Sequence, residues 1–454
     1  MKFSSLRQYI DFLNRRNELQ VITAQSNPEI EIARLAAQEV KKGGKALLFT
    51  QVAGSDFRLF MNGFGTQERM AAALGFSDLR QAEEKVRRLF SVLQCDSPSQ
   101  MLTRLDCLLS SACVFPVKTA WPTGLIEEKT DFFHYPALKT YPKDGGRFIT
   151  MGLTILRDPD TGKQNMGLYR LQVHDGQTLG VHIHRHKDGA RILEKYKRLN
   201  KPAPVAVAIG CAPVLQYAAT APLPGGIDEL AFAGFLQGRP QKTVECKENG
   251  LCLPADFEFL FTGYIDMRES RPEGPFGDHT GYYSAVAAYP VMHCSKTLRR
   301  ADAIFCATVV GKPPMEDYFM GLATQHIFLP PAQFLCPEIA DWFFPPEGIF
   351  HGCVVISIHN RYPGAANKVL HFVWGNSQLM FSKAVILVDA EVNPADYSEV
   401  LWRVFNNVDW KRDVTLVEGA LDVLDHAGGA KIGIDATEKR FLPHWPERTD
   451  FNAL

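Results

Sequence analysis

Side chains that could take part in catalysis are most concentrated in the segment 271–283. It holds two carboxylates, Glu273 and Asp278, with His279 and two tyrosines, in a loop rich in proline and glycine. Rigid loops with clustered acids suit acid–base chemistry, because burial and local partners can set each pKa separately. A turn-rich loop with a capping aspartate is the plainer interpretation. The clustering favours a functional site.

A second segment, 158–170, joins an acidic turn to a strand that carries Asn165 and Arg170. Positions five apart on a regular strand point to opposite faces unless a bulge or turn intervenes. Gly167, between the two, makes such an irregularity plausible. Taken alone, this segment favours an ordinary hairpin with a solvated arginine.

A third segment, 181–189, places His182, His184 and His186 at alternate positions. In a strand they would share one face, and imidazole is the commonest transition-metal ligand. Three of the 13 histidines in so short a stretch indicate a metal or anion site rather than a polar edge strand. A zinc hydrolase using these histidines remains open at this point.

The fourth segment, 222–234, is a proline- and glycine-rich loop followed by an apolar helix that starts straight after Asp228 and Glu229. Acidic residues in a first helical turn ordinarily interact favourably with the positive end of the helix dipole. Glu229 becomes a ligand candidate only if the fold brings it to Asn165 and His186.

The elements that must position these residues change in character along the chain. Residues from about 1 to 100 show helical spacing, as in Leu6, Tyr9, Ile10 and Leu13, around a short strand at 46–49. From about 105 to 295, closely spaced strands indicate a barrel or sandwich-like domain. They are expected at 148–156, 166–174, 179–186, 205–209 and 257–265. The last third alternates strands (354–358, 384–388) with helices (364–373, 396–406), followed by a tail at 441–454. The fold class is therefore α+β or α/β with a central β domain.

Composition excludes several function classes. With Lys+Arg 49 against Asp+Glu 50 among 454 residues, the chain has no charge excess suited to nucleic acid or an anionic membrane surface. No apolar run is long enough to span a bilayer, and the N-terminus does not read as a signal peptide. The ten cysteines form no Cys-x-x-Cys pair and read as reduced thiols, so a cytoplasmic location is expected.

In this order, the four segments resemble the successive signatures of UbiD-type decarboxylases. The resemblance is carried by Asn165–Arg170, His186–Ala190, Glu229–Gly234 and Glu273–Tyr283, and extends to Ala46–Phe49, Phe344–Gly348, Phe381–Lys383 and Lys431–Thr437. It implies an N-terminal α/β domain at 1–104, a central split β-barrel that binds flavin at 105–298, and a C-terminal α/β oligomerisation domain with a terminal helix and tail at 299–454.

The resemblance also implies cofactors and a supplier. The family uses prenylated FMN, made by a separate flavin prenyltransferase and held through its phosphate by Mn²⁺ and often a monovalent cation such as K⁺. The implied metal ligands are Asn165, His186 and Glu229, a donor set that suits a hard octahedral ion. The implied cofactor-binding residues are Asn165, Met166, Gly167, Leu168, Tyr169, Arg170, Arg185, His186, Glu229 and Lys383. His182 and His184 have no family role and are expected to be wall residues.

The catalytic residues that the resemblance implies are Arg170, Glu273 and Asp278. Arg170 would clamp the substrate carboxylate with its fork of donors, and Glu273 would fix the plane of the guanidinium. Asp278 would donate a proton to the carbon that CO₂ leaves, for which its pKa is expected to be raised by burial and a nearby carboxylate. The reaction is reversible, so carboxylation at high CO₂ is expected too.

The substrate is expected to be an aromatic, heteroaromatic or α,β-unsaturated carboxylic acid, since Tyr318, Phe319 and Met320 could form an apolar, polarizable wall. Homodimers or hexamers are expected through the C-terminal third. Two rival functions are the hydrolase with His182, His184 and His186, and a non-catalytic flavin-binding protein. Stoichiometric zinc would favour the first, and a Glu273→Gln variant that keeps its function in the cell would favour the second.

Overall fold

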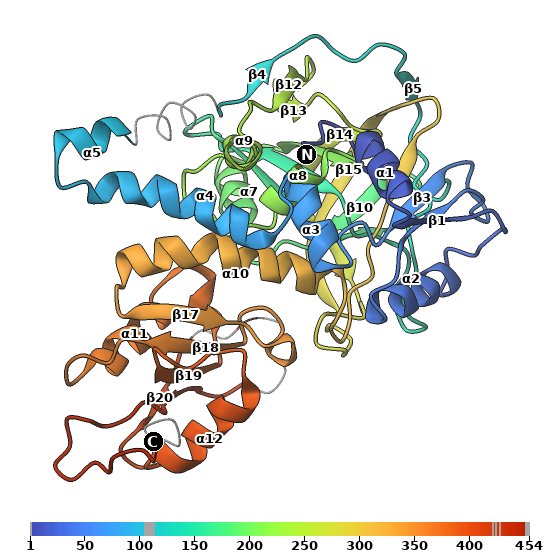
Figure 1. Ribbon diagram of the computed structural model, residues 1–454. Coiled ribbons are helices and arrows are strands. Elements are labelled where there is room, and N and C mark those ends of the chain that lie inside the picture. Colours follow the sequence, from blue (N-terminus) through green and yellow to red (C-terminus); the bar gives the residue numbers. More distant parts are fainter. Residues whose placement is uncertain (1, 104–113, 420–421, 423–424, 426–427, 450–454) are drawn as a thin grey trace. The chain divides into compact units, whose positions relative to one another are not determined.

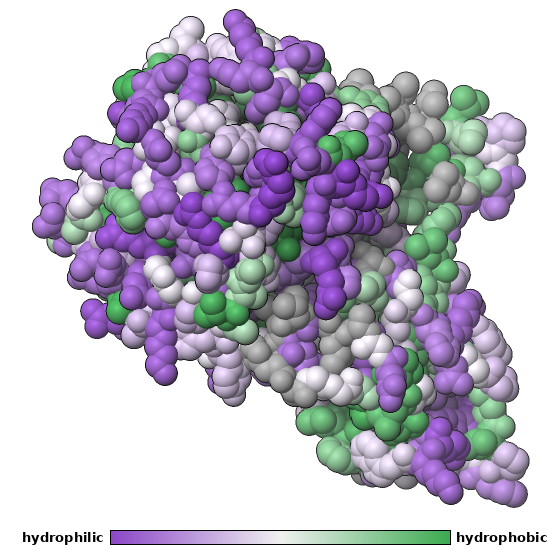
Figure 2. Space-filling view, turned by 180° about the vertical axis from the view of Figure 1, so that it is seen from behind, coloured by the Kyte–Doolittle hydropathy of each residue, from purple (hydrophilic) through white to green (hydrophobic). Residues whose placement is uncertain are grey.

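The computed structural model describes residues 2–103, 114–419, 422, 425 and 428–449. The chain forms two units, residues 1–324 and residues 325–454. Figure 1 shows the helices and strands of the two units. These elements confirm the predicted mixed α/β fold. The face seen in Figure 2 is largely hydrophilic, with apolar residues in scattered groups.

The N-terminal part of the first unit is a four-stranded sheet with flanking helices. Its strand order is β1-β2-β3-β16, with β2 and β3 antiparallel and the outer pairs parallel. The strands are β1 Leu19–Ile22, β2 Ala46–Phe49, β3 Arg58–Met61 and β16 Ile304–Cys306. The helices are α1 Leu6–Arg15, α2 Glu31–Lys41, α3 Gln67–Leu74, α4 Leu79–Ser91 and α5 Pro98–Thr103, with a 3-10 turn at Val92–Gln94.

Helix α1 shows why these elements form where the sequence predicts. The side chain of Ser5 accepts a hydrogen bond from the Gln8 backbone N–H, which satisfies an otherwise unpaired donor at the start of the helix. Leu6, Tyr9, Ile10, Phe12 and Leu13 are then buried on one side of it.

The centre of the first unit is a nine-stranded sheet that curls into a half-barrel. Its order is β6-β9-β10-β15-β14-β11-β7-β8, with β5 paired to β15. The strands are β5 Ile126–Glu128, β6 Phe148–Ile149, β7 Leu153–Arg157, β8 Gln164–Leu168, β9 Leu171–Val173, β10 Thr178–Val181, β11 Ala203–Ile209, β14 Phe259–Glu273 and β15 Ala287–Arg299. Register shifts between β14 and β15, at Thr262/Gly263 and Ile265/Ser270, bend this long pair.

Three helices and a small sheet complete the first unit. The helices are α7 Asp188–Arg198, α8 Pro213–Ala218 and α9 Glu229–Gln237, and the three-stranded sheet joins β4 Val117–Lys118, β12 Lys242–Glu245 and β13 Cys252–Pro254. Asp228 caps α9, its Oδ1 accepting from the Ala231 N–H at 2.9 Å. Helix α10, Glu316–Leu335, spans the division between the two units.

The second unit is a five-stranded sheet of order β17-β18-β19-β21-β20, parallel in its centre with antiparallel edge strands. Its elements are β17 Ile339–Phe343, β18 Cys353–Ile358, α11 Ala365–Trp374, β19 Ala384–Asp389, α12 Tyr397–Asn407, β20 Val414–Val417 and β21 Lys431–Asp435, with 3-10 turns at Pro346–Gly348 and Ser377–Phe381. Buried side chains of α11 and α12 belong to separate apolar clusters, because the sheet buries both faces.

Three strand predictions need correction. The strand predicted to reach His186 ends at Val181, because the chain turns there, with the Lys187 N–H bonded to the His184 carbonyl at 2.9 Å. The predicted strand 166–174 is interrupted at Tyr169 and Arg170, and the one at 148–156 is interrupted at residues 150–152. The end of the predicted tail, 450–454, lies outside the described residues.

Two expectations from composition can be compared with the structure. None of the helices in the described part of the chain is long and apolar enough to cross a membrane. Each of the eight cysteines that the structure describes is free, and Cys211 and Cys306 are buried. The limits of the three predicted domains stay predictions.

Candidate functional site

The break between β8 and β9 divides the candidate site into two parts. Tyr169 and Arg170 leave the strand ladder, and the Tyr169 ring folds back over Gly167. A Cβ on Gly167 would lie 2.4 Å from that ring, so the close approach requires glycine. The predicted irregularity therefore exists, at residues 169–170 rather than at Gly167 itself.

The first part of the site joins Asn165 on β8 to Glu229 at the start of α9. The side-chain Nδ2 of Asn165 donates to Oε1 of Glu229 at 2.5 Å, although 64 residues separate them. Burial raises the pKa of Glu229 to about 7. Backbone N–H groups and the Asn165 amide lower this pKa, and the Asp228 carboxylate raises it further.

A half-buried carboxylate beside an amide is a fitting donor set for a hard cation. The amide of Asn165 can turn over and present its oxygen to the point that Glu229 Oε1 faces, and carboxylate and amide oxygens suit Mn²⁺ or Mg²⁺. An added positive charge would offset the cost of burying Glu229. The residues present therefore fit a divalent metal.

Tyr169 ties the turn that contains His186 to this pair. The Tyr169 hydroxyl lies 3.5 Å from Asn165 Oδ1, and a Cβ on Gly189 would lie 3.0 Å from the same hydroxyl. Gly189 is the second residue of α7, three residues after His186. His186 itself is exposed, and its place as the third ligand stays a prediction.

The second part of the site is built around the guanidinium of Arg170. Its Nε and Nη2 donate to Oε1 and Oε2 of Glu273 at 2.9 and 3.1 Å, a two-point pairing that fixes the plane of the group. Nη2 also donates to Ser284 Oγ at 3.1 Å, and the Phe276 ring centroid lies 4.5 Å from Cζ. Arg170 is therefore held on one edge and one face.

Glu273 is fully buried at the end of β14. Burial alone would raise its pKa, but His182 and Arg170 lower the pKa of Glu273 below its ordinary value. The remaining edge of Arg170 faces Asp278, with Nη1 donating to Oδ2 at 2.6 Å. The structure thus brings Arg170, Glu273 and Asp278 into one hydrogen-bonded group.

The pKa of Asp278 differs from the expectation. Burial would raise it, but the positive charges of His279 and Arg170 and their hydrogen bonds hold the pKa of Asp278 below its ordinary value. The neighbouring carboxylate does not dominate because Arg170 lies between Glu273 and Asp278 and pairs with both.

Comparisons with known proteins show the family of this chain. Three family models match in order: the N-terminal domain of 3-octaprenyl-4-hydroxybenzoate carboxy-lyase (UbiD) over residues 10–89, its Rift-related domain over 118–313 and its C-terminal domain over 318–436. An uncharacterized protein of Archaeoglobus fulgidus is 42% identical over 468 residues, covering 100% of this chain and 96% of that protein. The chain belongs to the UbiD family.

Solved UbiD-class structures share the fold along the whole chain. Vanillic acid decarboxylase of Sedimentibacter hydroxybenzoicus, in closed form, matches with a TM-score of 0.88 at 25% identity, covering 99% of this chain and 96% of that one. An evolved dimeric form of the UbiD-class enzyme HmfF from Pelotomaculum thermopropionicum, in complex with prenylated FMN, matches with a TM-score of 0.78 at 27% identity, covering 99% and 97%. These matches assign this UbiD-family chain to the carboxy-lyases.

His182 is a residue of the candidate site whose contacts were not predicted. Its Nδ1 lies 2.8 Å from Glu273 Oε2 and 3.0 Å from Arg170 Nη2, and its ring stacks on Tyr289 at 4.1 Å between centroids. Its Nε2 lies 2.8 Å from Nε2 of His184. The run of alternate histidines was the available signal; Ser284 and Tyr289 gave none.

The predicted histidine metal cluster is not found. Among the described residues, the one group of three His, Cys, Asp or Glu ligand atoms within 4.8 Å of one another is Asp389, Glu391 and Glu438. Those acids lie beside the guanidinium of Arg403, which pairs with each of them. His182 and His184 meet, but among the described residues no third ligand atom completes a cluster with them, and the strand that would align all three histidines ends at Val181.

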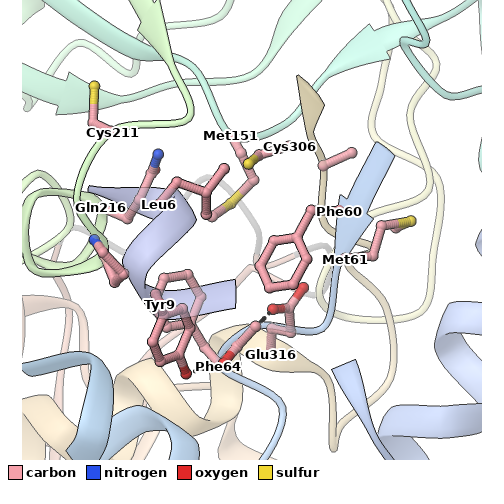
Figure 3. A pocket seen from close by; sticks show the side chains of 13 residues that line it. Leu6, Tyr9, Phe60, Met61, Phe64, Met151, Cys211, Gln216, Cys306 and Glu316 are labelled. Atoms are coloured by element: carbon pink, nitrogen blue, oxygen red, sulfur yellow. Dashed lines mark hydrogen bonds between the residues drawn. The ribbon is translucent and has the colours of Figure 1, made fainter. Parts of the chain in front are cut away.

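The first turn of α10 lies beside a small cavity that Glu316 helps to line. Glu316 accepts a hydrogen bond from the Phe64 N–H at 3.0 Å and anchors the start of the helix (Figure 3). The cavity holds about 20 Å³, enough for one water and too small for a substrate. Glu316 thereby fixes the residues that follow it on α10.

The predicted substrate wall follows directly on α10. Successive helical residues point about 100° apart, so Tyr318, Phe319 and Met320 cannot all face one pocket. Met320 is buried, whereas Tyr318 and Phe319 are half-buried, with ring centroids 5.1 Å apart. Their contact with substrate stays a prediction.

Two further residues predicted to bind the cofactor are Arg185 and Lys383. Arg185 is exposed in the turn before α7, whose N-terminus has no side-chain cap. Lys383 belongs to the second unit, where its Nζ lies 2.7 Å from Asp425 Oδ2. Their approach to a flavin phosphate stays a prediction.

Proposed function

We propose that this chain is a prenylated-FMN-dependent decarboxylase of an aromatic, heteroaromatic or α,β-unsaturated carboxylic acid. The observation that carries the proposal is the unequal hydrogen bonding on the two edges of the Arg170 guanidinium. One edge of its guanidinium is fixed by Glu273 and the other is held by a single bond to Asp278. A substrate carboxylate can replace Asp278 on that edge without disturbing Glu273.

The cofactor belongs on the Asn165 side of the strand break. Asn165, Glu229 and His186 would hold Mn²⁺, which in turn would bind the flavin phosphate, with K⁺ as a second ion. Positive potential from Arg185 and the N-terminus of α7 supports an anion there, and Lys383 would add a further charge. Met166, Gly167, Leu168 and Tyr169 would line the cofactor. When bound, prenylated FMN supplies the electron sink for the carbon–carbon bond that breaks.

Arg170 has the task of binding and orienting the substrate carboxylate. Its Nη1 faces the position that Asp278 occupies, and the two bonds to Glu273 keep the guanidinium from rotating. Because Glu273 is fully buried and ionised, Arg170 stays charged and planar through the reaction. The Phe276 ring covers one face of the guanidinium.

Asp278 has the task of delivering the proton. In the free chain it is a carboxylate, held so by Arg170 and His279. A substrate carboxylate that takes over Arg170 removes that stabilisation and adds a negative charge, so the pKa of Asp278 rises on substrate binding. Asp278 then takes up a proton and transfers it to the substrate carbon when CO₂ has left.

Self-association through the second unit is part of the proposal. Helix α12 exposes Tyr397, Leu401, Trp402 and Phe405, the last with 72% of its surface accessible. An apolar helical face of this kind marks a protein–protein contact. A homodimer or hexamer of this chain would cover it, and a flavin prenyltransferase would act earlier, as the supplier of the cofactor.

The experiment for this proposal is co-expression with a flavin prenyltransferase, followed by native mass spectrometry and an assay of CO₂ release. We expect one prenylated FMN and one Mn²⁺ per chain, and CO₂ from at least one acid in a panel of aromatic, heteroaromatic and α,β-unsaturated acids. A protein with stoichiometric zinc and no flavin would overturn the proposal.

A further inference from the structure

The imidazole of His279 lies between two carboxylates. Its Nδ1 is hydrogen-bonded to Oδ2 of Asp317, and its Nε2 lies 3.8 Å from Oδ1 of Asp278. Asp278 is 4% exposed and the side chain of Asp317 is 14% exposed, so both act largely away from bulk water. The three groups form a line that ends at the Arg170 site.

The fold fixes both ends of this line. Asp317 follows the anchored Glu316 in the first turn of α10, and its Oδ1 accepts from the Tyr318 N–H at 2.8 Å. At the other end Arg170 occupies Oδ2 of Asp278. Oδ1 of Asp278 therefore faces the His279 ring, and it also accepts a hydrogen bond from the backbone N–H of His279 at 2.8 Å.

Asp317 decides which nitrogen of His279 carries a fixed proton. A carboxylate only accepts hydrogen bonds, so Nδ1 must be the donor toward Asp317. The nitrogen that can gain and lose a proton is then Nε2, which faces Asp278. This is the arrangement by which a buried acid orients an imidazole for proton transfer.

The surrounding charges keep His279 available as an acid. Burial lowers its pKa, but Asp317 and then Asp278 more than offset this and raise the pKa of His279 above its ordinary value, with Arg170 opposing them. Because the pKa is raised, the imidazolium form is present below it and is lost as pH rises through it.

We propose that His279, oriented by Asp317, is the relay that returns a proton to Asp278 in every turnover. This rests on the proposed function, in which decarboxylation consumes one solvent proton for each CO₂ released. The Nε2–H bond of the imidazolium breaks and an O–H bond forms on Asp278 Oδ1. Neutral His279, with Nδ1–H still toward Asp317, then takes a proton from water at Nε2. A small rotation of the ring or one intervening water closes the 3.8 Å gap.

Nuclear magnetic resonance on the cofactor-free protein tests the pair without any catalysis. With ¹⁵N-labelled histidine, His279 is expected to titrate above the ordinary value of about 6.5 and to show the Nδ1–H tautomer when neutral. In D317N its pKa is expected to fall by about one unit, a ten-fold loss in proton affinity. A His279 that titrates below the ordinary value, or a pKa unchanged in D317N, would overturn the proposal.

Kinetics on the flavin-loaded protein test the relay itself, with whichever acid the wild type decarboxylates fastest. H279Q should lower kcat about 10- to 100-fold with KM unchanged. This loss is smaller than that for most general acid–base groups, about 100- to 10,000-fold, because His279 acts through Asp278. D317N should move the alkaline limb of the kcat–pH profile to lower pH by about one unit. The control is E269Q, which removes the carboxylate 2.6 Å from another histidine, His293, outside this line; it should leave kcat and its pH profile as in the wild type.

The outcomes separate the relay from the proposed function. If the loaded wild type releases no CO₂ from any acid, the proposed function fails while the resonance titration still reports on His279 and Asp317. If the wild type is active and H279Q and D317N keep its kcat and pH profile, the relay is wrong and the decarboxylase stands. Exogenous imidazole should restore kcat to H279A, which a merely structural role of the ring would not allow.

Discussion

Asp278 accepts a 2.6 Å hydrogen bond from Nη1 of Arg170, while Glu273 holds the opposite edge of the same guanidinium. The two carboxylates are alike in chemistry but differ in how they are held. Glu273 makes two bonds to Arg170 and one to His182, whereas Asp278 makes one bond to Arg170. The single bond is the one that a substrate carboxylate can exchange.

Replacing Glu273 by Gln should lower kcat/KM by about 100- to 10,000-fold, because a neutral amide no longer fixes or balances Arg170. Cofactor content should stay as in the wild type. Steady-state kinetics and flavin absorbance on the same preparation check both points. E269Q, on the same strand, is the matched control and should keep wild-type kinetics.

The D278N variant should bind cofactor and substrate but turn over at least 100-fold more slowly, because an amide cannot donate the required proton. In the free chain it should also change the dependence of stability on pH. The lowered folded pKa of Asp278 gives stability that is present above its unfolded value, about 3.9, and is lost as pH falls through the folded value.

Urea unfolding of the cofactor-free wild type and D278N from pH 3 to 7 measures this effect. The wild type should be more stable by about 1 to 3 kcal/mol at neutral pH, with the difference shrinking in acid. A difference that grows as pH falls would contradict the pairing with Arg170.

Binding of Mn²⁺ should stabilise the cofactor-free protein, and removal of the metal should reverse this. We expect Mn²⁺ to raise the Tm of the cofactor-free wild type and EDTA to reverse the rise, since a ligand that binds the folded state stabilises it. E229Q and N165A should lose the shift, because one ligand is gone in each. The control is D158N, a carboxylate that pairs with Lys195 and lies outside the ligand set; it should keep the Mn²⁺ response.

Substituting Gly167 by Ala should cost about 1 to 3 kcal/mol of folding free energy, since the new Cβ would lie 2.4 Å from the Tyr169 ring. Displacing Tyr169 should also weaken Mn²⁺ binding. Thermal unfolding and metal titration measure the two effects. Gly225→Ala, where an added Cβ meets nothing within 4 Å, should be close to neutral.

Replacing Phe405 by Glu should reduce the oligomeric state without unfolding the chain. Phe405 is the most exposed of the large apolar residues on α12, and a charge in an apolar contact is costly. Sedimentation velocity should show a smaller species than the wild type. A wild type that is monomeric at all concentrations would contradict the proposed contact.

Elements set by local pattern were predictable from the sequence. Helix α1 and strand β2 follow the spacing and turn residues that predict them, and the predicted apolar helix after the proline- and glycine-rich loop is α9. The end of β10 at Val181 was not predictable, because the residues beyond it alternate as a strand would. A turn that depends on packing against distant elements leaves no local signal.

The site was partly predictable for a similar reason. The side-chain chemistry of Arg170, Glu273 and Asp278 can be read from the sequence, and the family resemblance predicted that the three act together. The pKa of Asp278 depends instead on Arg170 and His279 together, and pairing across 108 residues is visible only in the fold. Asp317 was missed because nothing in its own segment indicates contact with His279.

The most direct test of the central claim is CO₂ release by the flavin-loaded wild type and by flavin-loaded E273Q from the same acid, in one assay. We predict release by the wild type and a loss of at least 100-fold in E273Q at equal flavin content. A flavin-loaded wild type that is inactive on every acid of the panel, or an E273Q as fast as the wild type, would contradict the account.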